Sequence, residues 1–314
     1  MKRVLVTGAS GFIGCALVPF LVARGYAVRA ASRTPSQAGE GIEQVPSPDL
    51  ARRPDWSAPL KGVDIVIHAA ATAHTRGVDE AALDAVNHRA VAALAEAAQG
   101  RVERLVFLSS IRAQSGSCAA GILTEAQQPR PADAYGRAKL AAEKALIASG
   151  IPFVTLRPVL VAGCSPSGNL RALLRLAQLR LPLPMGAFTA KRSLVDRDDL
   201  CAAIAHVLVG NAHLGETYIV AHPDPIEIAV MLAALRHGLD RRPGLFAIPP
   251  FLTKTALAPP FMGGMREKLL GDLVASPEKL MKTGWVPKVT PHLALTRTAA
   301  ASSRRKMPVK GEAS

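Results

Sequence analysis

Apolar and polar residues alternate in two rhythms along the first half of the chain. Short apolar runs predict buried strands at 4–6, 27–31, 63–70, 105–108 and 153–156, with a weaker strand at 42–45. Segments with helical spacing lie between them, at 15–22, 78–99 and 132–149. Strands that are apolar throughout are typical of a parallel sheet covered on both faces. The alternation therefore predicts an α/β fold with a doubly wound parallel sheet.

The turn after the first predicted strand contains three glycines, Gly8, Gly11 and Gly14, with Phe12 and Ile13 between the last two. Gly8 permits a tight turn, Gly11 lets the backbone approach a ligand, and Gly14 allows close helix packing. The helix that follows offers free N–H groups and a positive dipole end to an anion. A strand, a glycine turn and a helix in this order indicate the pyrophosphate site of a Rossmann-type fold, with a turn that binds nothing as the alternative.

The regular rhythm ends near Pro158, and a different set of elements follows. The pattern predicts a loop at 161–168, helices at 170–179, 196–209 and 226–237, and a strand at 216–220. We therefore expect a dinucleotide-binding domain at 1–160 and a smaller, mainly substrate-binding α+β lobe at 161–300. Residues 301–314 are rich in arginine and lysine and are predicted to form a disordered basic tail.

Composition limits the classes of partner. The 314 residues are 49% hydrophobic and 20% charged, which suits a sizeable core. The net charge is +14, but the basic residues are scattered and aromatics make up only 4%, so no nucleic-acid partner is expected. The sequence opens without a signal-peptide pattern, and no apolar run reaches membrane-spanning length. We therefore expect a cytoplasmic protein without a membrane partner.

Cysteine and histidine spacing gives no sign of a metal. The four cysteines are far apart and form no CxxC pair, and the eight histidines show no HxxxH or HExxH spacing. Neither a disulfide framework nor a bound metal is expected.

Residues in the middle of the chain carry candidate catalytic chemistry. Tyr135 and Lys139 are four residues apart, which puts a phenol and an ammonium on one face of a helix. The cation favours the phenolate, so the phenol can exchange a proton with a substrate hydroxyl or ketone. Ser109 and Ser110 follow the strand at 105–108, at the edge where such sheets bind ligands. A serine there can donate to a carbonyl oxygen; we prefer Ser110, with Ser109 or a shifted neighbour as alternatives.

The glycine turn, the strand-end serine and the Tyr/Lys helix, in this order, resemble the short-chain dehydrogenase/reductase superfamily and its extended, epimerase/dehydratase branch. Further similarity covers nearly the whole chain: VIHAAA at 66–71, Asn87, LRP at 156–158, and the stretches 168–170, 181–184, 191–194, 269–273 and 284–287. The resemblance implies that Ala69, Ala70 and Pro158 line the cofactor together with the glycine turn.

Within that branch the chain is similar to bacterial nucleotide-sugar 4-epimerases and to 4-keto reductases that make UDP-N-acetylquinovosamine. This similarity implies that Asn169 and Arg192 lie towards a nucleotide-sugar. A helix cap at Asn169 and an ordinary surface charge at Arg192 are the structural alternatives.

The end of the second predicted strand bears on the choice of cofactor. An acidic residue there would bind a ribose diol, but Ser32 and Arg33 occupy this place. A hydroxyl and a guanidinium suit a 2′-phosphate, which arginine can bind through two hydrogen bonds. We therefore expect NADP in preference to NAD, with Arg33 as a simple loop charge as the alternative.

Together these patterns predict an NAD(P)-dependent oxidoreductase acting at C4 of a nucleotide-linked hexose, by 4-keto reduction or 4-epimerisation, for surface polysaccharide precursors. Two other classes stay open. One is a non-catalytic dinucleotide-binding sensor or accessory subunit of a respiratory complex, and the other is a reductase of a non-nucleotide substrate such as a steroid. The resemblance also makes a homodimer an expected assembly.

Overall fold

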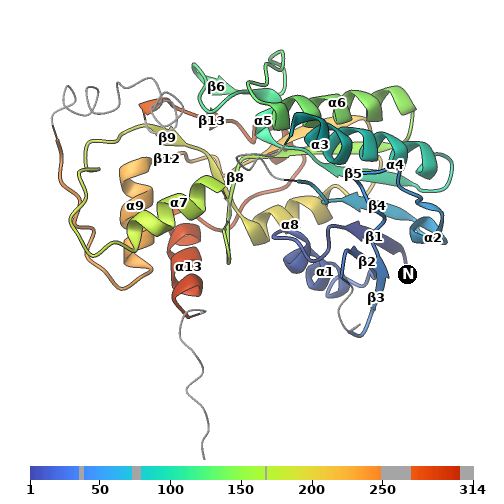
Figure 1. Cartoon of the computed structure of the whole chain (residues 1–314), viewed down its shortest axis with the longest axis horizontal. Helices are drawn as coiled ribbons and strands as arrows, with labels where there is room; N and C mark the ends of the chain where they lie inside the picture. The colour runs from blue at the N-terminus through green and yellow to red at the C-terminus, as the bar shows by residue number, and fades with distance from the viewer. Residues whose placement is uncertain (35–38, 73–78, 167, 249–269, 305–314) are drawn as a thin grey trace, which may run out of the picture.

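Seven parallel strands form the main sheet of the computed structural model, which describes residues 1–34, 39–72, 79–166, 168–248 and 270–304. The strand order is β11-β7-β5-β4-β1-β2-β3 (Figure 1). The strands are β1 Arg3–Thr7, β2 Ala27–Ser32, β3 Ile42–Pro46, β4 Ile65–His68, β5 Arg104–Leu108, β7 Phe153–Pro158 and β11 Glu216–Val220. The predicted doubly wound α/β sheet is confirmed.

Helices cover both faces of the sheet (Figure 1). One face carries α3 (Glu80–Asp84), the π-helical turn η1 (Ala85–Arg89), α4 (Ala90–Ala98) and α6 (Ala134–Ser149), which contact one another. The other face carries α1 (Gly14–Val22) and α8 (Arg197–His206), which pack together. Two short helices, α2 (Ser57–Leu60) and α5 (Ile111–Gln114), follow β3 and β5. No helix within the described ranges is long and apolar enough to cross a membrane.

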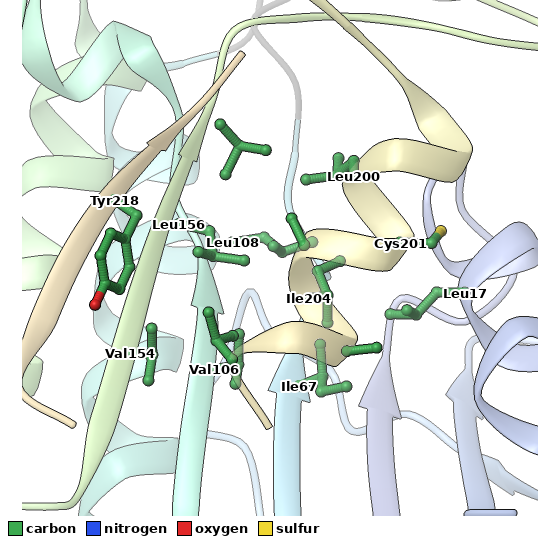
Figure 2. Close-up of a cluster of buried hydrophobic side chains, with 14 of the residues drawn as sticks. Leu17, Ile67, Val106, Leu108, Val154, Leu156, Leu200, Cys201, Ile204 and Tyr218 are labelled. Atoms are coloured by element: carbon green, nitrogen blue, oxygen red, sulfur yellow. The ribbon is translucent and has the colours of Figure 1, made fainter. Parts of the chain in front are cut away.

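The two layers of helices explain why the strands are apolar at successive positions. In β5, Val106 and Leu108 belong to a buried cluster with Ile204 of α8 (Figure 2). Phe107 belongs to a different buried cluster, with Leu94 of α4. Side chains alternate between the faces of a strand, so a sheet covered on both faces needs apolar residues at neighbouring positions.

A second cluster of helices lies beside the sheet: α7 (Gly168–Ala177), α9 (Ile228–His237) and α13 (Pro291–Arg304) (Figure 1). Its core is separate from those of the sheet and includes Leu174, Met231 and Leu295. The remaining described elements are the strand pairs β8 (Leu160–Ala162) with β10 (Leu194–Asp196), β9 (Lys191–Arg192) with β12 (Ile226–Glu227), and β6 (Ile122–Leu123) with β13 (Val274–Ala275), and the helix α12 (Glu278–Met281).

Four elements differ from the sequence-based expectation. The helix expected at 196–209 in the smaller lobe forms α8, which packs with α1 against the main sheet. The strand at 216–220, expected in the smaller lobe, forms β11 and pairs with β7 at the edge of the main sheet. It gets there because α8 crosses back over the sheet, and an apolar run does not reveal which sheet it joins. The helix expected at 78–99 contains the turn η1. α13 continues to Arg304, because its apolar face packs on α9, so the predicted tail is helical at 301–304. The rest of that tail, 305–314, lies outside the described residues.

Candidate active site

The glycine turn between β1 and α1 lies directly against the end of β4. A Cβ atom on Gly8, whose φ is +68°, would come within 2.7 Å of the Ala70 nitrogen. A Cβ on Gly14 would overlap the Gly8 carbonyl, so neither position has room for a side chain. The Gly11 N–H donates to the Gly8 carbonyl at 2.9 Å and closes the turn. No side chain caps α1, and its Cys15 N–H donates to the Gly11 carbonyl at 3.0 Å.

Thr7 and His68 join the ends of β1 and β4 beneath this turn. Thr7 Oγ1 lies 3.0 Å from His68 Nδ1 and also accepts the Ala70 N–H at 3.3 Å. His68 is fully buried, and burial, aided by the charge of Lys139, lowers its pKa to about 3. The structure therefore places Ala69 and Ala70 beside the glycine turn, on a neutral, buried support.

Ser110 and Tyr135 interact where β5 ends and α6 begins, and Lys139 lies one turn after Tyr135 on α6. Ser110 caps α5 by accepting the Arg112 N–H at 3.2 Å, and its side chain also shares a hydrogen bond with the Tyr135 phenol. Asp133 caps α6 and forms an ion pair with Arg112, which links the starts of the two helices. Phenol and hydroxyl are thus held together by the caps of α5 and α6.

The two titratable groups of this site are shifted in opposite directions. Burial raises the pKa of Tyr135 to about 12, and the hydrogen bond from Ser110 opposes the shift. Burial lowers the pKa of Lys139 to about 7, and the carboxylate of Glu143 opposes that shift. Lys139 Nζ donates to the Leu108 carbonyl at 2.8 Å. In the free protein the phenol is therefore held as an acid, while the lysine titrates near neutral pH.

Ser109, the alternative to Ser110, has a different environment. It is only 4% exposed, and its hydroxyl donates to the carboxylate of Glu143, which also pairs with Arg157. Ser110 is less buried and contacts the phenol. The geometry favours Ser110 as the residue that meets a substrate.

The remaining predicted cofactor residues lie at the ends of two other strands of the sheet. Ser32 ends β2, is buried, and donates its hydroxyl hydrogen to the Thr34 carbonyl at 3.0 Å. Arg33 follows and is exposed. Pro158 ends β7. Arg33 is therefore the more accessible of the two residues expected to select the cofactor.

Asn169 lies on α7 and Arg192 on β9, both outside the main sheet. Asn169 is exposed in the first turn of α7. Arg192, on β9, is half-buried and donates to the Gly271 carbonyl and, at 2.9 Å, to the Lys191 carbonyl. Burial lowers its pKa, with opposing effects from Asp272 and Cys118. Because Cys118 follows α5, Arg192 lies near the loop on the catalytic side of the sheet.

The sequence patterns missed Glu143 and gave Asn87 no structural role. Glu143 is four residues after Lys139, so Tyr135, Lys139 and Glu143 follow one stripe of α6, and this spacing could have revealed it. Asn87 was noted only for its resemblance; it is fully buried in η1 and exchanges two hydrogen bonds of 3.0 Å with the Thr72 backbone. Among the described residues, no group of three histidine, cysteine or acidic side chains could hold a metal.

A sequence profile of the NAD-dependent epimerase/dehydratase family matches residues 4–221. The chain belongs to this family. It is an NAD(P)-dependent enzyme of the extended short-chain dehydrogenase/reductase type, which confirms the resemblance drawn from the glycine turn and the Tyr/Lys helix.

Individual relatives of this family member have several activities. A UDP-glucose 4-epimerase of Vibrio cholerae is 29% identical over 313 residues, covering 96% of this chain and 95% of the relative. A dihydroflavonol 4-reductase of Zea mays is 29% identical over 269 residues, or 73% of each chain. The solved UDP-glucuronic acid 4-epimerase of Bacillus cereus, in complex with UDP-glucuronic acid and NAD, has a TM-score of 0.78 at 19% identity, covering 97% of this chain and all of that one. This last likeness shows the shared fold.

Proposed function

We propose that the protein oxidises or reduces C4 of a nucleotide-linked hexose. The observation that carries the proposal is the hydrogen bond between the Ser110 and Tyr135 side chains, with Lys139 bound to the end of β5 one turn along α6, at the sheet edge that also holds the glycine turn. Similarity to a UDP-glucose 4-epimerase along 96% of the chain supports a nucleotide-sugar as the substrate.

In this proposal the dinucleotide lies across the carboxyl ends of the strands. Residues 8–14, with Phe12 and Ile13 just before α1, would hold the diphosphate against Ala69 and Ala70, because glycine at positions 8 and 14 lets the backbone of the turn pack closely there. Ser32 and Arg33 would face the adenosine ribose, and Pro158 the nicotinamide. The bound dinucleotide would supply the hydride chemistry.

Tyr135 is the proposed acid and base for the C4 oxygen. Its raised pKa keeps the phenol protonated in the free protein, and protonation of the oxygen during reduction of a ketone needs this form. In the opposite direction Lys139 favours the phenolate and also holds a ribose hydroxyl. Ser110 donates a hydrogen bond to the C4 oxygen as negative charge develops on it.

Reduction and epimerisation would use the same residues, and two observations favour different outcomes. Exposed Arg33 beside Ser32 suits the 2′-phosphate of NADP, and NADP favours net reduction of a 4-keto sugar. The nearly full-length similarity to a 4-epimerase favours epimerisation with NAD that stays bound.

Purification followed by two assays tests the proposal. Absorbance of the purified protein would reveal retained dinucleotide, and incubation with UDP-glucose would reveal UDP-galactose. Retained NAD together with interconversion of UDP-glucose and UDP-galactose identifies an epimerase. Protein that is purified without dinucleotide and oxidises NADPH when a UDP-4-keto-hexose is added is a reductase. Tyr135→Phe should abolish either activity. No conversion of any UDP-hexose, together with no thermal shift from UDP-sugars, would contradict a nucleotide-sugar substrate.

A reductase of a non-nucleotide substrate is the second candidate, supported by similarity to a dihydroflavonol 4-reductase over 73% of the chain. The substrate of such an enzyme has no nucleotide diphosphate, so Arg192 would not be needed to bind one. A thermal shift with UDP that disappears in Arg192→Gln supports the nucleotide-sugar, and a shift with dihydroflavonol or steroid but not UDP supports the second candidate. A non-catalytic sensor would retain its dinucleotide affinity in Tyr135→Phe and show no turnover in either form.

The setting of the enzyme is part of the proposal. We place it in the cytoplasm, which suits its free thiols at Cys15, Cys118, Cys164 and Cys201. Asn169 and Arg192 would contact the nucleotide-sugar, and the product would serve surface polysaccharide synthesis. A homodimer is expected, and light scattering of the purified protein would test it.

A further inference from the structure

Four buried polar side chains form one hydrogen-bonded group behind the catalytic edge: Ser109, Gln114, Glu143 and Arg157, here called the Glu143 cluster. Each is no more than 5% exposed. Arg157 binds the Glu143 carboxylate through two nitrogens, with Nε 3.0 Å from Oε1 and Nη2 bonded to Oε2. Ser109 donates to the same Oε1, and Arg157 Nη1 donates to the Gln114 side chain. The carboxylate is therefore enclosed by donors.

Members of this cluster are the immediate neighbours of the proposed site residues on three different elements. Ser109 precedes Ser110 after β5, and Arg157 precedes Pro158 in β7. Glu143 lies one turn after Lys139 on α6. A change in the position of the Glu143 carboxylate would therefore affect the positions of Ser110, Lys139 and Pro158 together.

The negative charge of Glu143 also affects Lys139. The Lys139 ammonium is buried, and two titratable groups interact with it: Glu143 from α6 and His68 from β4. Arg157 from β7 is paired with Glu143, while Asp133 and Arg112 act on Tyr135, one turn earlier on α6. His68 is neutral near pH 7, because burial holds its pKa at about 3. Glu143 is thus the acidic group that offsets the lysine, and it is shared with the second cation, Arg157.

We propose that Glu143 is a positioning residue that sets the charge of Lys139 during the reaction, and that Arg157 limits this effect by sharing the carboxylate. The inference rests on the proposed function and extends it to two residues that do not touch the substrate. The lowered pKa of Lys139, which Glu143 opposes, agrees with it.

The two partners provide variants with opposite expected effects. Glu143→Gln keeps the size of the side chain but removes the charge, so Lys139 should lose its proton at lower pH. Arg157→Gln removes the competing cation, so Lys139 should keep its proton to higher pH. A shift of about one pH unit in each direction, equivalent to about tenfold in protonation at a fixed pH, is expected.

NMR of the lysine side-chain Nζ groups measures these titrations directly, with Lys139→Arg identifying the signal. The pH dependence of kcat/KM for UDP-glucose should follow the same order, with its alkaline limb lowest in Glu143→Gln and highest in Arg157→Gln. If Glu143 and Arg157 had only a structural role, both variants would have a lower Tm, and the pKa of Lys139 would shift in the same direction in both or not at all. That result would overturn the inference.

The outcomes separate this inference from the proposed function. If the wild-type protein converts no UDP-hexose, the proposed function is wrong. The titration of Lys139 in the variants still shows whether Glu143 and Arg157 control its charge. If the variants shift the pKa of Lys139 but leave the alkaline limb of the kcat/KM profile unchanged, Glu143 has no role in the reaction and the inference is wrong. Should either single variant not fold, Glu143→Gln/Arg157→Gln removes both buried charges together. Its titration should then lie within about half a pH unit of wild type, and a larger displacement would overturn the sharing of the carboxylate.

Discussion

Lys139 donates a hydrogen from Nζ to the carbonyl of Leu108, 2.8 Å away, and so joins α6 to the last residue of β5. The bond spans the point where the chain turns from β5 towards Ser110. It uses one of the three donors of the ammonium, so two remain for a cofactor ribose. The proposed proton donor, Tyr135, lies one turn earlier on the same helix. Its distance from the end of β5 therefore depends on this bond.

Replacement of the two adjacent serines should distinguish their roles in catalysis. Ser110→Ala removes the hydroxyl next to Tyr135 and should lower kcat about 10²-fold, because one donor to a developing oxyanion contributes that much. It also removes the cap of α5 and should lower the free energy of unfolding by about 0.5–2 kcal/mol. Ser109→Ala removes a buried donor to Glu143 and should lower the free energy of unfolding by about 1–3 kcal/mol. Steady-state rates and urea unfolding of both variants check this. A larger loss of kcat in Ser109→Ala would show that the serines have the opposite roles.

Arg33 should decide between the two dinucleotides. Arg33→Ala is expected to raise KM for NADPH at least about tenfold while leaving KM for NADH nearly unchanged, since a charged hydrogen bond to phosphate contributes about 1.5–3 kcal/mol. The exposed Arg101, at the opposite end of the sheet before β5, provides the control Arg101→Ala. Equal effects on NADPH and NADH would remove the argument for NADP.

Gly14 should tolerate no side chain. Its Cβ would overlap the Gly8 carbonyl, so Gly14→Ala must displace the turn, at a cost of about 2 kcal/mol or more. We expect a lower Tm and at least about tenfold weaker dinucleotide binding by fluorescence titration. Gly39→Ala is the matched control, because its Cβ would meet only the Ile42 side chain at 3.6 Å. Unchanged binding in Gly14→Ala would contradict a close approach of the turn to the cofactor.

Acid should destabilise the protein partly through His68. Its pKa of about 3 in the folded chain lies below the value near 6.5 of an unfolded histidine, so between these values only the unfolded chain takes up the proton. The stabilising contribution is therefore complete above about pH 6.5 and is lost as pH falls, by about 2 kcal/mol at pH 5. Urea unfolding at pH 7.5 and 5 measures this loss.

His68→Leu should reduce the difference between the two pH values even though it lowers stability at both. His292→Gln changes an exposed histidine and serves as its control. The same pH dependence in His68→Leu and wild type would show that this imidazole is not the group responsible.

Much of the sheet was predictable because its signals are local. Apolar residues at successive positions, as in β4 and β5, indicate strands buried on both faces wherever they occur in a chain. The glycine turn is only partly local, since Gly14 is crowded by Gly8 and Ala9 of the turn itself, whereas Gly8 is crowded by the backbone that follows β4, far along the chain. Tyr135 and Lys139 share a helix face through their spacing alone.

The sheet edge that β11 joins and the hydrogen-bond partners of Ser109 and Ser110 were not predictable in this way. β11 joins β7 because α8 returns the chain to that edge, and nothing in residues 216–220 specifies the edge. Ser109 and Ser110 are adjacent and identical in type, yet one contacts Glu143 and the other Tyr135, 34 and 25 positions away.

Local sequence was thus enough for the identity of the strands, the position of the glycine turn and the shared helix face of Tyr135 and Lys139, because each depends mainly on residues a few positions apart. The pairing of Glu143 with Arg157, the choice between two serines and the edge taken by β11 required the folded chain. These features depend on contacts between distant segments, and the direction of a buried side chain is set by the neighbours that packing brings to it.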